Sequence, residues 1–245
     1  MIYTAFVVIV YLLTCVVMLP TLVVMSQSKK MHPVALRFHE WWAKVYFKLI
    51  FMRVEVVGQE KLQKGEQYIF CCNHFSFLDI PAFYLFYNPK FIGKSSLKKI
   101  PLFGYFFKKI HIPVDRSSSR SRAESLQKSQ TALDEGYSLA FFPEGGIVVK
   151  EDELPYMRPF KQGAFKLGIE NKVSIVPVTM PYNFEILPDK SPIRFYRRTL
   201  KIIIHDPIDP SSYDDDDTTE LKSEVFQTIQ TELLNHHPDK VKSLG

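Results

Sequence analysis

The sequence is poor in cysteine. It has three in 245 residues: Cys71 and Cys72 are adjacent, and Cys15 lies in an apolar segment. Neither a disulfide framework nor a CxxC site can be built from this arrangement, so a reducing compartment is expected. The chain also has no internal repeat, Walker A motif, GxGxxG fingerprint or GxSxG elbow. These absences argue against P-loop nucleotide binding, dinucleotide binding and α/β-hydrolase chemistry.

Charged residues are absent from the first 28 positions. Residues 2–25 are nearly all apolar, and as a helix they would extend about 36 Å, enough to cross the hydrocarbon core of a bilayer. A signal peptide is the alternative interpretation, but it needs a basic start and a small-residue cleavage site, and neither is clear here. We therefore expect a retained membrane anchor.

Acidic residues are scarce in the segment that follows. Residues 29–53 hold six basic residues and a single acid, Glu40, and this asymmetry predicts that they lie on the cytoplasmic face. Apolar residues at helical spacing predict a helix in the membrane interface, or one packed on the domain, or one arm of a hairpin that enters a single leaflet. The predicted apolar stripe comprises Val34, Phe38, Trp41, Trp42, Val45, Leu49 and Met52.

The most basic region spans residues 90–122, with nine basic residues against one acid, Asp115, and with interleaved aromatic residues. Basic and aromatic residues together can indicate nucleic-acid binding. Behind a membrane anchor, we favour anionic lipid or a phosphate-bearing substrate, and we expect no nucleic-acid partner. A solvated charged surface is the alternative, but it does not account for the aromatic residues.

Short apolar blocks alternate with helical patterns in the rest of the chain, and 46% of all residues are apolar. This alternation predicts one α/β domain, residues 53–245, with a mixed, largely parallel sheet flanked by helices, behind an anchor at residues 1–52. We expect strands at 53–57, 68–72, 91–94, 111–116, 138–142, 173–178 and 200–205, and helices at 80–87, 117–136, 161–169 and 220–234.

Three polar residues, His74, Arg116 and Glu144, lie at the C-terminal ends of predicted strands, where sites in open α/β sheets gather. His74 and Asp79 are five residues apart, so they can meet only if a turn between a strand and a helix separates them. An aspartate could then orient the histidine as a general base. The alternatives are a helix-capping Asp79, an ordinary loop histidine, and a nucleophilic Cys72 with His74 as its base.

Four short sequence blocks occur in a fixed order between residues 53 and 210. They are Asn73-His74-Phe75-Ser76-Phe77-Leu78-Asp79 (an NHxxxxD motif), Ile112-Pro113-Val114-Asp115-Arg116, Phe142-Pro143-Glu144-Gly145 and Ile175-Val176-Pro177-Val178. With these blocks, the chain resembles the 1-acylglycerol-3-phosphate acyltransferase (PlsC-like) family of glycerolipid acyltransferases. A further segment, residues 160–164, resembles the family's FKxGA sequence.

The resemblance implies acyl transfer from acyl-CoA or acyl carrier protein to the free hydroxyl of a lysophospholipid, most simply 1-acylglycerol-3-phosphate, giving phosphatidic acid. His74 would be the general base, with Asp79 orienting it. No cofactor and no metal is implied. The resemblance assigns the acceptor site to Asn73, Lys94, Arg116, Glu144 and Gly145, with Arg116 on the phosphate.

One departure concerns the third block, which in the family continues as Thr-Arg. Here Gly146-Ile147 follow instead, so a phosphate-binding arginine is missing from its usual place. Another cation could replace it, or the acceptor could be a different lyso-lipid. A non-catalytic membrane lipid-binding protein is the further alternative. The candidate replacement cations are Lys94, Lys98 and Lys161.

Overall fold

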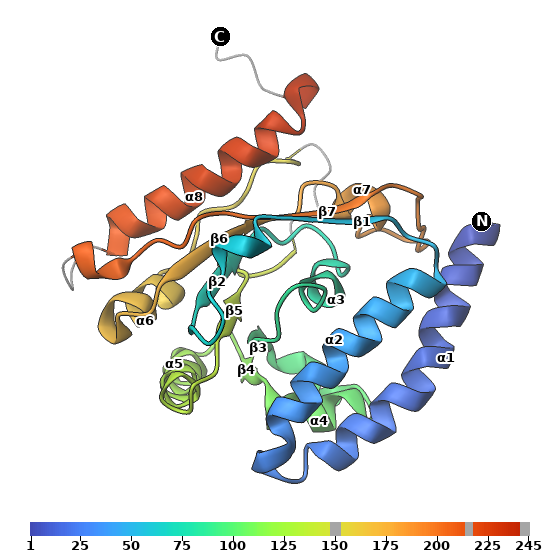
Figure 1. Ribbon diagram of the computed structural model, residues 1–245, viewed down its shortest axis with the longest axis horizontal. Helices are drawn as coiled ribbons and strands as arrows, with labels where there is room; N and C mark the ends of the chain where they lie inside the picture. Colours follow the sequence, from blue (N-terminus) through green and yellow to red (C-terminus); the bar gives the residue numbers. More distant parts are fainter. Residues whose placement is uncertain (148–152, 214–217, 241–245) are drawn as a thin grey trace. The chain divides into compact units, whose positions relative to one another are not determined.

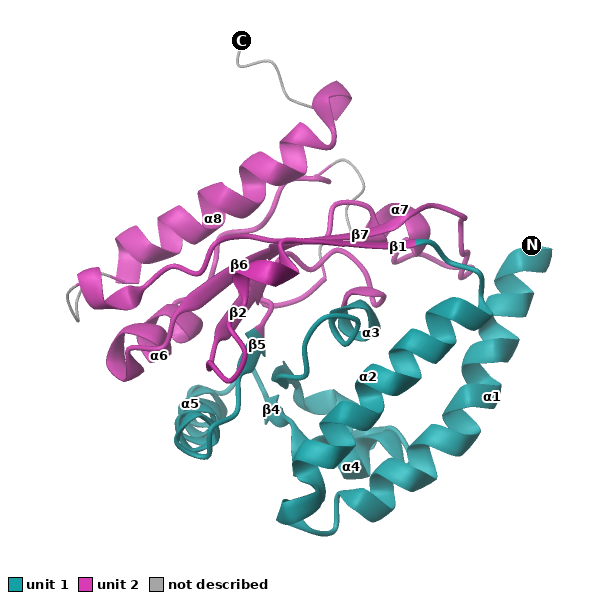
Figure 2. Cartoon of the chain, viewed as in Figure 1, with its two compact units in different colours: residues 1–53, 80–140 teal, residues 54–79, 141–245 magenta. Residues whose placement is uncertain are grey.

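The computed structural model describes residues 1–147, 153–213 and 218–240. Figure 1 labels its helices and strands. Figure 2 colours two compact units, each built from two separate stretches of chain. Unit 1 comprises Met1–Arg53 and Ile80–Ala140, and unit 2 comprises Val54–Asp79 and Phe141–Gly245. The expected division into residues 1–52 and 53–245 stays a prediction.

Unit 1 combines a helical hairpin with parallel strands. Strand β3 lies between β4 and β5 and runs parallel to both. Helix α5 begins where the Ser118 side chain accepts the Ser121 N–H, and Gly136, with a φ of +82°, follows its end, as expected for a helix stop. Its elements are α1 (Ile2–Met25), α2 (His32–Leu49), β3 (Lys90–Lys94), α4 (Phe103–Ile110), β4 (Ile112–Val114), α5 (Ser119–Asp134) and most of β5 (Leu139–Phe141).

Helices α1 and α2 are antiparallel and pack side by side (Figure 1). Tyr11 of α1 lies edge-on to Trp42 and Tyr46 of α2, with ring centroids 6.1 and 5.8 Å apart. Where α1 begins and α2 ends, the Tyr3 hydroxyl donates to the Ile50 carbonyl at 3.2 Å. Helix α1 has the predicted bounds and is long and apolar enough to cross a membrane.

The apolar stripe predicted for α2 is only partly the face that packs. Trp41 and Leu49 of that stripe are 54% and 46% exposed. The packed face is offset from the predicted stripe and includes two alanines and two histidines, which carry a weak hydrophobic signal in the sequence. Its buried members are His32, Ala35, Leu36, His39, Trp42, Ala43, Tyr46 and Phe47.

The aromatic residues of the basic region have a structural explanation that the sequence interpretation missed. Phe106 and Phe107 lie on α4 and are buried in unit 1, while Lys108 and Lys109 on the same helix are exposed. The apolar side chains of α4 recur at positions 103, 106, 107 and 110, which is the spacing of a helix that packs on one side. These phenylalanines therefore belong to the core of unit 1 and not to a ligand surface.

Unit 2 carries four neighbouring strands in the order β1-β7-β6-β2. Strands β1 and β7 are parallel, β6 and β7 are antiparallel, and β2 and β6 are parallel, so the arrangement is mixed and mostly parallel, as predicted. The elements are β1 (Val54–Val57), β2 (Ile69–Cys72), α6 (Gly163–Asn171), β6 (Ile175–Thr179), α7 (Asn183–Ile186), β7 (Leu200–Ile204) and α8 (Thr218–Asn235), and the short helix α3 (Asp79–Phe83) begins in this unit.

Strands β2 and β6 are buried along their whole length, which explains why they read as continuous apolar blocks. Their register pairs Ile69 with Ile175 and Cys72 with Val178. Helix α8 packs against β6 and α6, and every fourth residue from Leu221 to Leu233 is buried. The two strands end side by side, and the chain that follows each of them forms the candidate site.

Candidate active site

His74 and Asp79 are in direct contact. The Nδ1 atom of His74 lies 2.9 Å from Oδ2 of Asp79, and the two side chains are 11% and 0% exposed. His74 comes two residues after β2, and Asp79 is the first residue of α3. The predicted turn between strand and helix is therefore present, and it brings together two side chains that are five residues apart in the sequence.

The turn wraps around the Asp79 carboxylate. Oδ2 also accepts the main-chain N–H groups of Phe75 and Ser76, both at 2.9 Å. Oδ1 accepts the side-chain amide of Asn183, from α7, at 2.8 Å. Hydrogen bonds of this kind stabilise a buried carboxylate in its charged form, which can accept the Nδ1–H of His74. Asp79 thus bonds back to the preceding loop, in addition to starting a helix.

Glu144 holds the main chain of His74. Its Oε1 accepts the His74 N–H at 2.7 Å, and its Oε2 accepts the Arg158 N–H at 2.9 Å. Burial raises the pKa of Glu144 to about 8; the charge of Asp79 acts in the same direction, and the two N–H bonds oppose it. The carboxyl group therefore joins three segments of unit 2 that are far apart in the sequence.

The ring of His74 is also fixed on one face. Phe142 stacks on it with ring centroids 4.0 Å apart and an interplanar angle of 19°. Sequence reasoning used Phe142 as part of a motif without giving it a role. Together with the Asp79 and Glu144 contacts, the stack fixes the direction in which the Nε2 atom of His74 points.

Asn73 connects the ends of β2 and β6. Its Oδ1 accepts the Met180 N–H at 2.8 Å, and its Nδ2 donates to the Met180 carbonyl at 3.1 Å. Both ends of the buried amide are thus occupied by main chain, and the substrate role implied for Asn73 stays a prediction. Gly145 has a φ of +90°, a conformation that favours glycine, and its N–H closes a turn onto Phe142.

The two remaining predicted residues, Lys94 and Arg116, lie in unit 1. Lys94 ends β3 and is exposed, and its register partner is Val114 of β4. Arg116 follows β4 by two residues and is partly buried, and burial lowers the pKa of its guanidinium. Their assignment to the acceptor site stays a prediction.

Arg158 is a cation that sequence reasoning missed. Its main chain is bonded to Glu144, its side chain is exposed, and its charge lowers the pKa of Glu144. In the described part of the chain no carboxylate forms an ion pair with its guanidinium. Lys161, one of the predicted substitutes, is exposed nearby in the sequence, and its N–H donates to the Pro143 carbonyl at 2.9 Å. Residues 158–161 are thus bonded through their main chain to two residues of the third motif, Pro143 and Glu144.

The arrangement does not favour Cys72 as a nucleophile. Cys72 is fully buried, its Sγ lies 3.8 Å from Oδ1 of Asn73, and burial raises the pKa of the thiol well above its ordinary value. A thiolate is therefore not available at neutral pH.

In residues 1–147, 153–213 and 218–240, no three His, Cys, Asp or Glu side chains gather as a metal site would require.

The chemistry available is that of a general base. With its Nδ1–H donated to Asp79, neutral His74 presents an unprotonated Nε2, which can accept a proton from a hydroxyl group. A charged Asp79 stabilises the imidazolium that results. This arrangement can activate a hydroxyl group as a nucleophile.

Known proteins have a similar sequence over part of this chain. The sequence model of the Acyltransferase family matches residues 53–181. A 1-acyl-sn-glycerol-3-phosphate acyltransferase of Chlamydomonas reinhardtii is 29% identical over 187 residues, which are 75% of this chain and 55% of the relative. The chloroplastic enzyme LPAT1 of Arabidopsis thaliana is 31% identical over 188 residues, which are 74% of this chain and 52% of the relative. The chain thus spans about half the length of these relatives.

A solved structure has a similar fold. The crystal structure of the 1-acyl-sn-glycerophosphate (LPA) acyltransferase PlsC from Thermotoga maritima gives a TM-score of 0.79 at 21% identity and covers 96% of this chain and 97% of that one. This likeness supports the α/β fold with its mixed, mostly parallel sheet and flanking helices. Because the family match covers more than half of the sequence, this chain belongs to the Acyltransferase family.

Proposed function

We propose that the protein transfers a fatty acyl group from an acyl thioester, on coenzyme A or acyl carrier protein, to the free hydroxyl of 1-acylglycerol-3-phosphate, giving phosphatidic acid. The observation that carries the proposal is the His74–Asp79 pair, with Nδ1 and Oδ2 2.9 Å apart. The match to the Acyltransferase family and the relatives named 1-acyl-sn-glycerol-3-phosphate acyltransferases support the reaction class.

In the proposed reaction His74 Nε2 removes the proton of the acceptor hydroxyl as its oxygen attacks the thioester carbonyl. An ester C–O bond forms and the C–S bond breaks. The leaving thiolate takes the proton from the imidazolium, so no acyl-enzyme is required. Asp79 keeps the ring in the productive tautomer, while Glu144 and Phe142 hold its position.

For the acceptor phosphate we propose Arg158 as the cation contributed by unit 2, while the assignment of Arg116 and Lys94, which lie in unit 1, rests on the sequence resemblance alone. A guanidinium is well shaped for two hydrogen bonds to a phosphate. Arg158 is tied through Glu144 to His74, so its main chain has a defined position relative to the base. Gly145 leaves room for close approach of a ligand to the main chain.

We also propose that the helical hairpin sits in the membrane and keeps the catalytic part on the cytoplasmic face. On helix α1 the side chains of Leu13, Val16 and Val17 are between 64% and 70% exposed. Exposed apolar side chains of this kind are stable in contact with lipid. Helix α2 lies alongside α1 and exposes basic residues, including Lys44 and Lys48. This arrangement favours entry into one leaflet over a full span for the pair.

The test is release of thiol by the detergent-purified protein, supplied with lysophosphatidate and either acyl-CoA or acylated acyl carrier protein. We expect acceptor-dependent release that His74→Ala lowers about 10²- to 10⁴-fold. Cys72→Ala is the matched control, because it changes a buried neighbour on β2, and it should keep turnover. If thiol is released only with another lyso-lipid, that lipid replaces lysophosphatidate as the proposed acceptor. No release with either donor would replace the proposal by non-catalytic lipid binding.

A further inference from the structure

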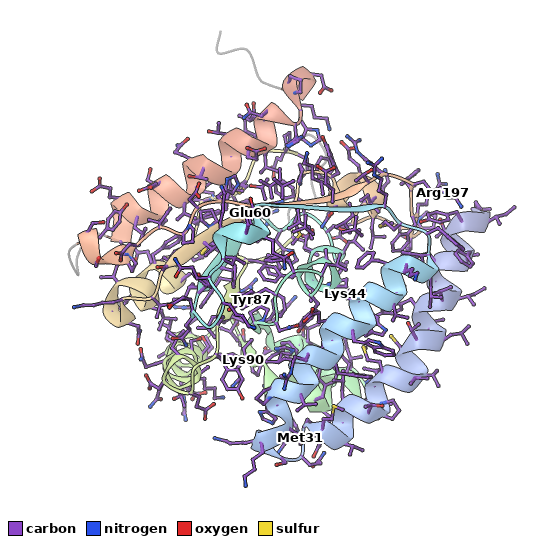
Figure 3. All side chains as sticks on the ribbon, in the orientation of Figure 1. Met31, Lys44, Glu60, Tyr87, Lys90 and Arg197 are labelled. Atoms are coloured by element: carbon purple, nitrogen blue, oxygen red, sulfur yellow. The ribbon has the colours of Figure 1, made fainter. Side chains whose placement is uncertain are left out.

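The segment between α7 and β7, residues 187–199, has an unusual surface composition. It contains four basic residues and one acid, Asp189. Ile193 and Tyr196 interrupt the basic residues and are 63% and 43% exposed. The basic residues are Lys190, Arg194, Arg197 (labelled in Figure 3) and Arg198.

This segment is anchored to the rest of unit 2 at its far end. The Tyr196 N–H donates to the Ile186 carbonyl at 2.8 Å. Arg198 forms an ion pair with Glu185, and its guanidinium lies 3.9 Å from the ring centroid of Tyr182. The exposed Ile193 is therefore presented on an anchored scaffold.

The near end of the segment is joined to the candidate site. The Ser76 hydroxyl, inside the His74–Asp79 turn, donates to the Leu187 carbonyl at 2.7 Å. Four residues earlier, Asn183 donates to Asp79 at 2.8 Å. The basic segment thus begins at Leu187, which is hydrogen-bonded to the turn between His74 and Asp79. A molecule that binds the segment would therefore lie against residues that contact this turn.

We propose that residues 187–199, which belong to unit 2, form a docking surface for an anionic lipid bilayer. Exposed aliphatic and aromatic side chains between basic residues are the composition that binds the interface of an anionic membrane. Isoleucine and tyrosine enter the headgroup region, and the exposed Arg194 pairs with lipid phosphates. The inference rests on exposure and charge, so it stands even if the acyl-transfer reaction proves different.

Two other anionic partners would be attracted by the same basic residues: a soluble acidic carrier protein and the phosphates of an acyl-CoA. Neither needs an aliphatic side chain in the position of Ile193, which is more exposed than Tyr196. Membrane lipid accounts for the charge and the apolar residue together.

The experiment measures contact with lipid directly in the full-length chain. Ile193→Cys is labelled with an environment-sensitive fluorophore in a Cys15→Ser background, because Cys71 and Cys72 are buried. The protein is added to vesicles of phosphatidylcholine with or without phosphatidylglycerol, both containing nitroxide-labelled lipid. Ser223→Cys, on an exposed position of α8, is the matched site on the same unit. We expect quenching at position 193 and not at 223, and only with phosphatidylglycerol.

A charge variant tests the electrostatic part. Loss of one cation near an anionic membrane weakens attraction about fivefold, so Arg194→Gln should lower the equilibrium constant for docking by that factor. Lys64→Gln, another exposed cation of unit 2, should leave it unchanged. Equal quenching at 193 and 223, or quenching independent of phosphatidylglycerol, overturns the proposal. An increase in KM for the acyl donor in Arg194→Gln, with quenching unchanged, overturns it in favour of donor binding.

Discussion

The side-chain amide of Asn183 donates to Oδ1 of Asp79 at 2.8 Å, from a position 104 residues further along the chain. The same Asp79 uses its other oxygen to hold His74 and the turn between them. Asn183 is thus a positioning residue that acts on the base through the carboxylate. Its own Oδ1 is buried without a hydrogen-bond partner among the described residues.

Asn183→Leu should therefore lower both stability and turnover. It leaves Asp79 Oδ1 buried without a donor, which costs about 1–3 kcal/mol of unfolding free energy. We expect kcat to fall more than KM changes, because the substituted residue orients the base and does not bind substrate. Asn171→Leu at the end of α6 is the matched substitution, and it should leave kcat unchanged. Thermal unfolding and thiol release measure the two effects; unchanged kcat in Asn183→Leu would contradict the positioning role.

Arg158→Gln should raise KM for a phosphate-bearing acceptor about 10- to 100-fold, since a charge-assisted hydrogen bond contributes about 1.5–3 kcal/mol. Turnover at saturating acceptor should change little, because His74 and Asp79 are untouched. Lys166→Gln on the exposed face of α6 provides the comparison. If instead Lys161→Gln raises KM and Arg158→Gln does not, the phosphate is bound by the lysine.

Glu144 gives stability a dependence on pH with a definite sign. Its pKa rises from about 4.5 when unfolded to about 8 in the folded protein. The folded state therefore binds more protons between these values, and the contribution of this group to stability falls as pH rises from about 4.5 to about 8. Glu144→Gln should remove that decline. Melting temperatures of both proteins across this range test it, and parallel curves would show that Glu144 does not titrate there.

His111 should act in the opposite sense. Burial, together with the nearby imidazole of His39, lowers the pKa of His111 well below 6.5. The unfolded chain then binds the extra proton, so stability is complete above about pH 6.5 and declines as pH falls below it. His111 accepts the Phe91 N–H and contacts the Tyr84 hydroxyl, contacts that a glutamine amide can reproduce. We expect His111→Gln to lessen the loss of melting temperature between pH 7.5 and pH 5, and an unaltered loss would contradict this origin.

The sequence predicted the parts of this protein that depend on local pattern. All seven expected strands are present within a few residues, and helix α1 has the predicted bounds, because uninterrupted apolar runs identify buried strands and membrane-length helices. The His74–Asp79 contact was predicted because a turn was the sole geometry that allowed it.

The parts that could not be predicted depend on contacts between distant residues. Asn183 and Arg158 carry no local signal, and their importance appears only when α7 and residues 142–145 are placed against the site turn. The packed face of α2 was misplaced because alanine and histidine contribute to it. Helix α4 was missed because its lysines and phenylalanines suggested a binding surface before they suggested a buried face.

The pair of hydrogen bonds between the Asn73 side chain and the Met180 main chain has a consequence for biosynthesis. Its two partners are 107 residues apart, and the other contacts that hold the base reach as far as position 183. A nascent chain emerges from the ribosome with its apolar N-terminal helix first, so it can meet a membrane long before the base is oriented. We predict that chains truncated before position 180 are membrane-bound and inactive, which fractionation and a thiol-release assay of such truncations would reveal. Under the proposed membrane role of α1, the order of these segments in the chain places insertion before orientation of the base.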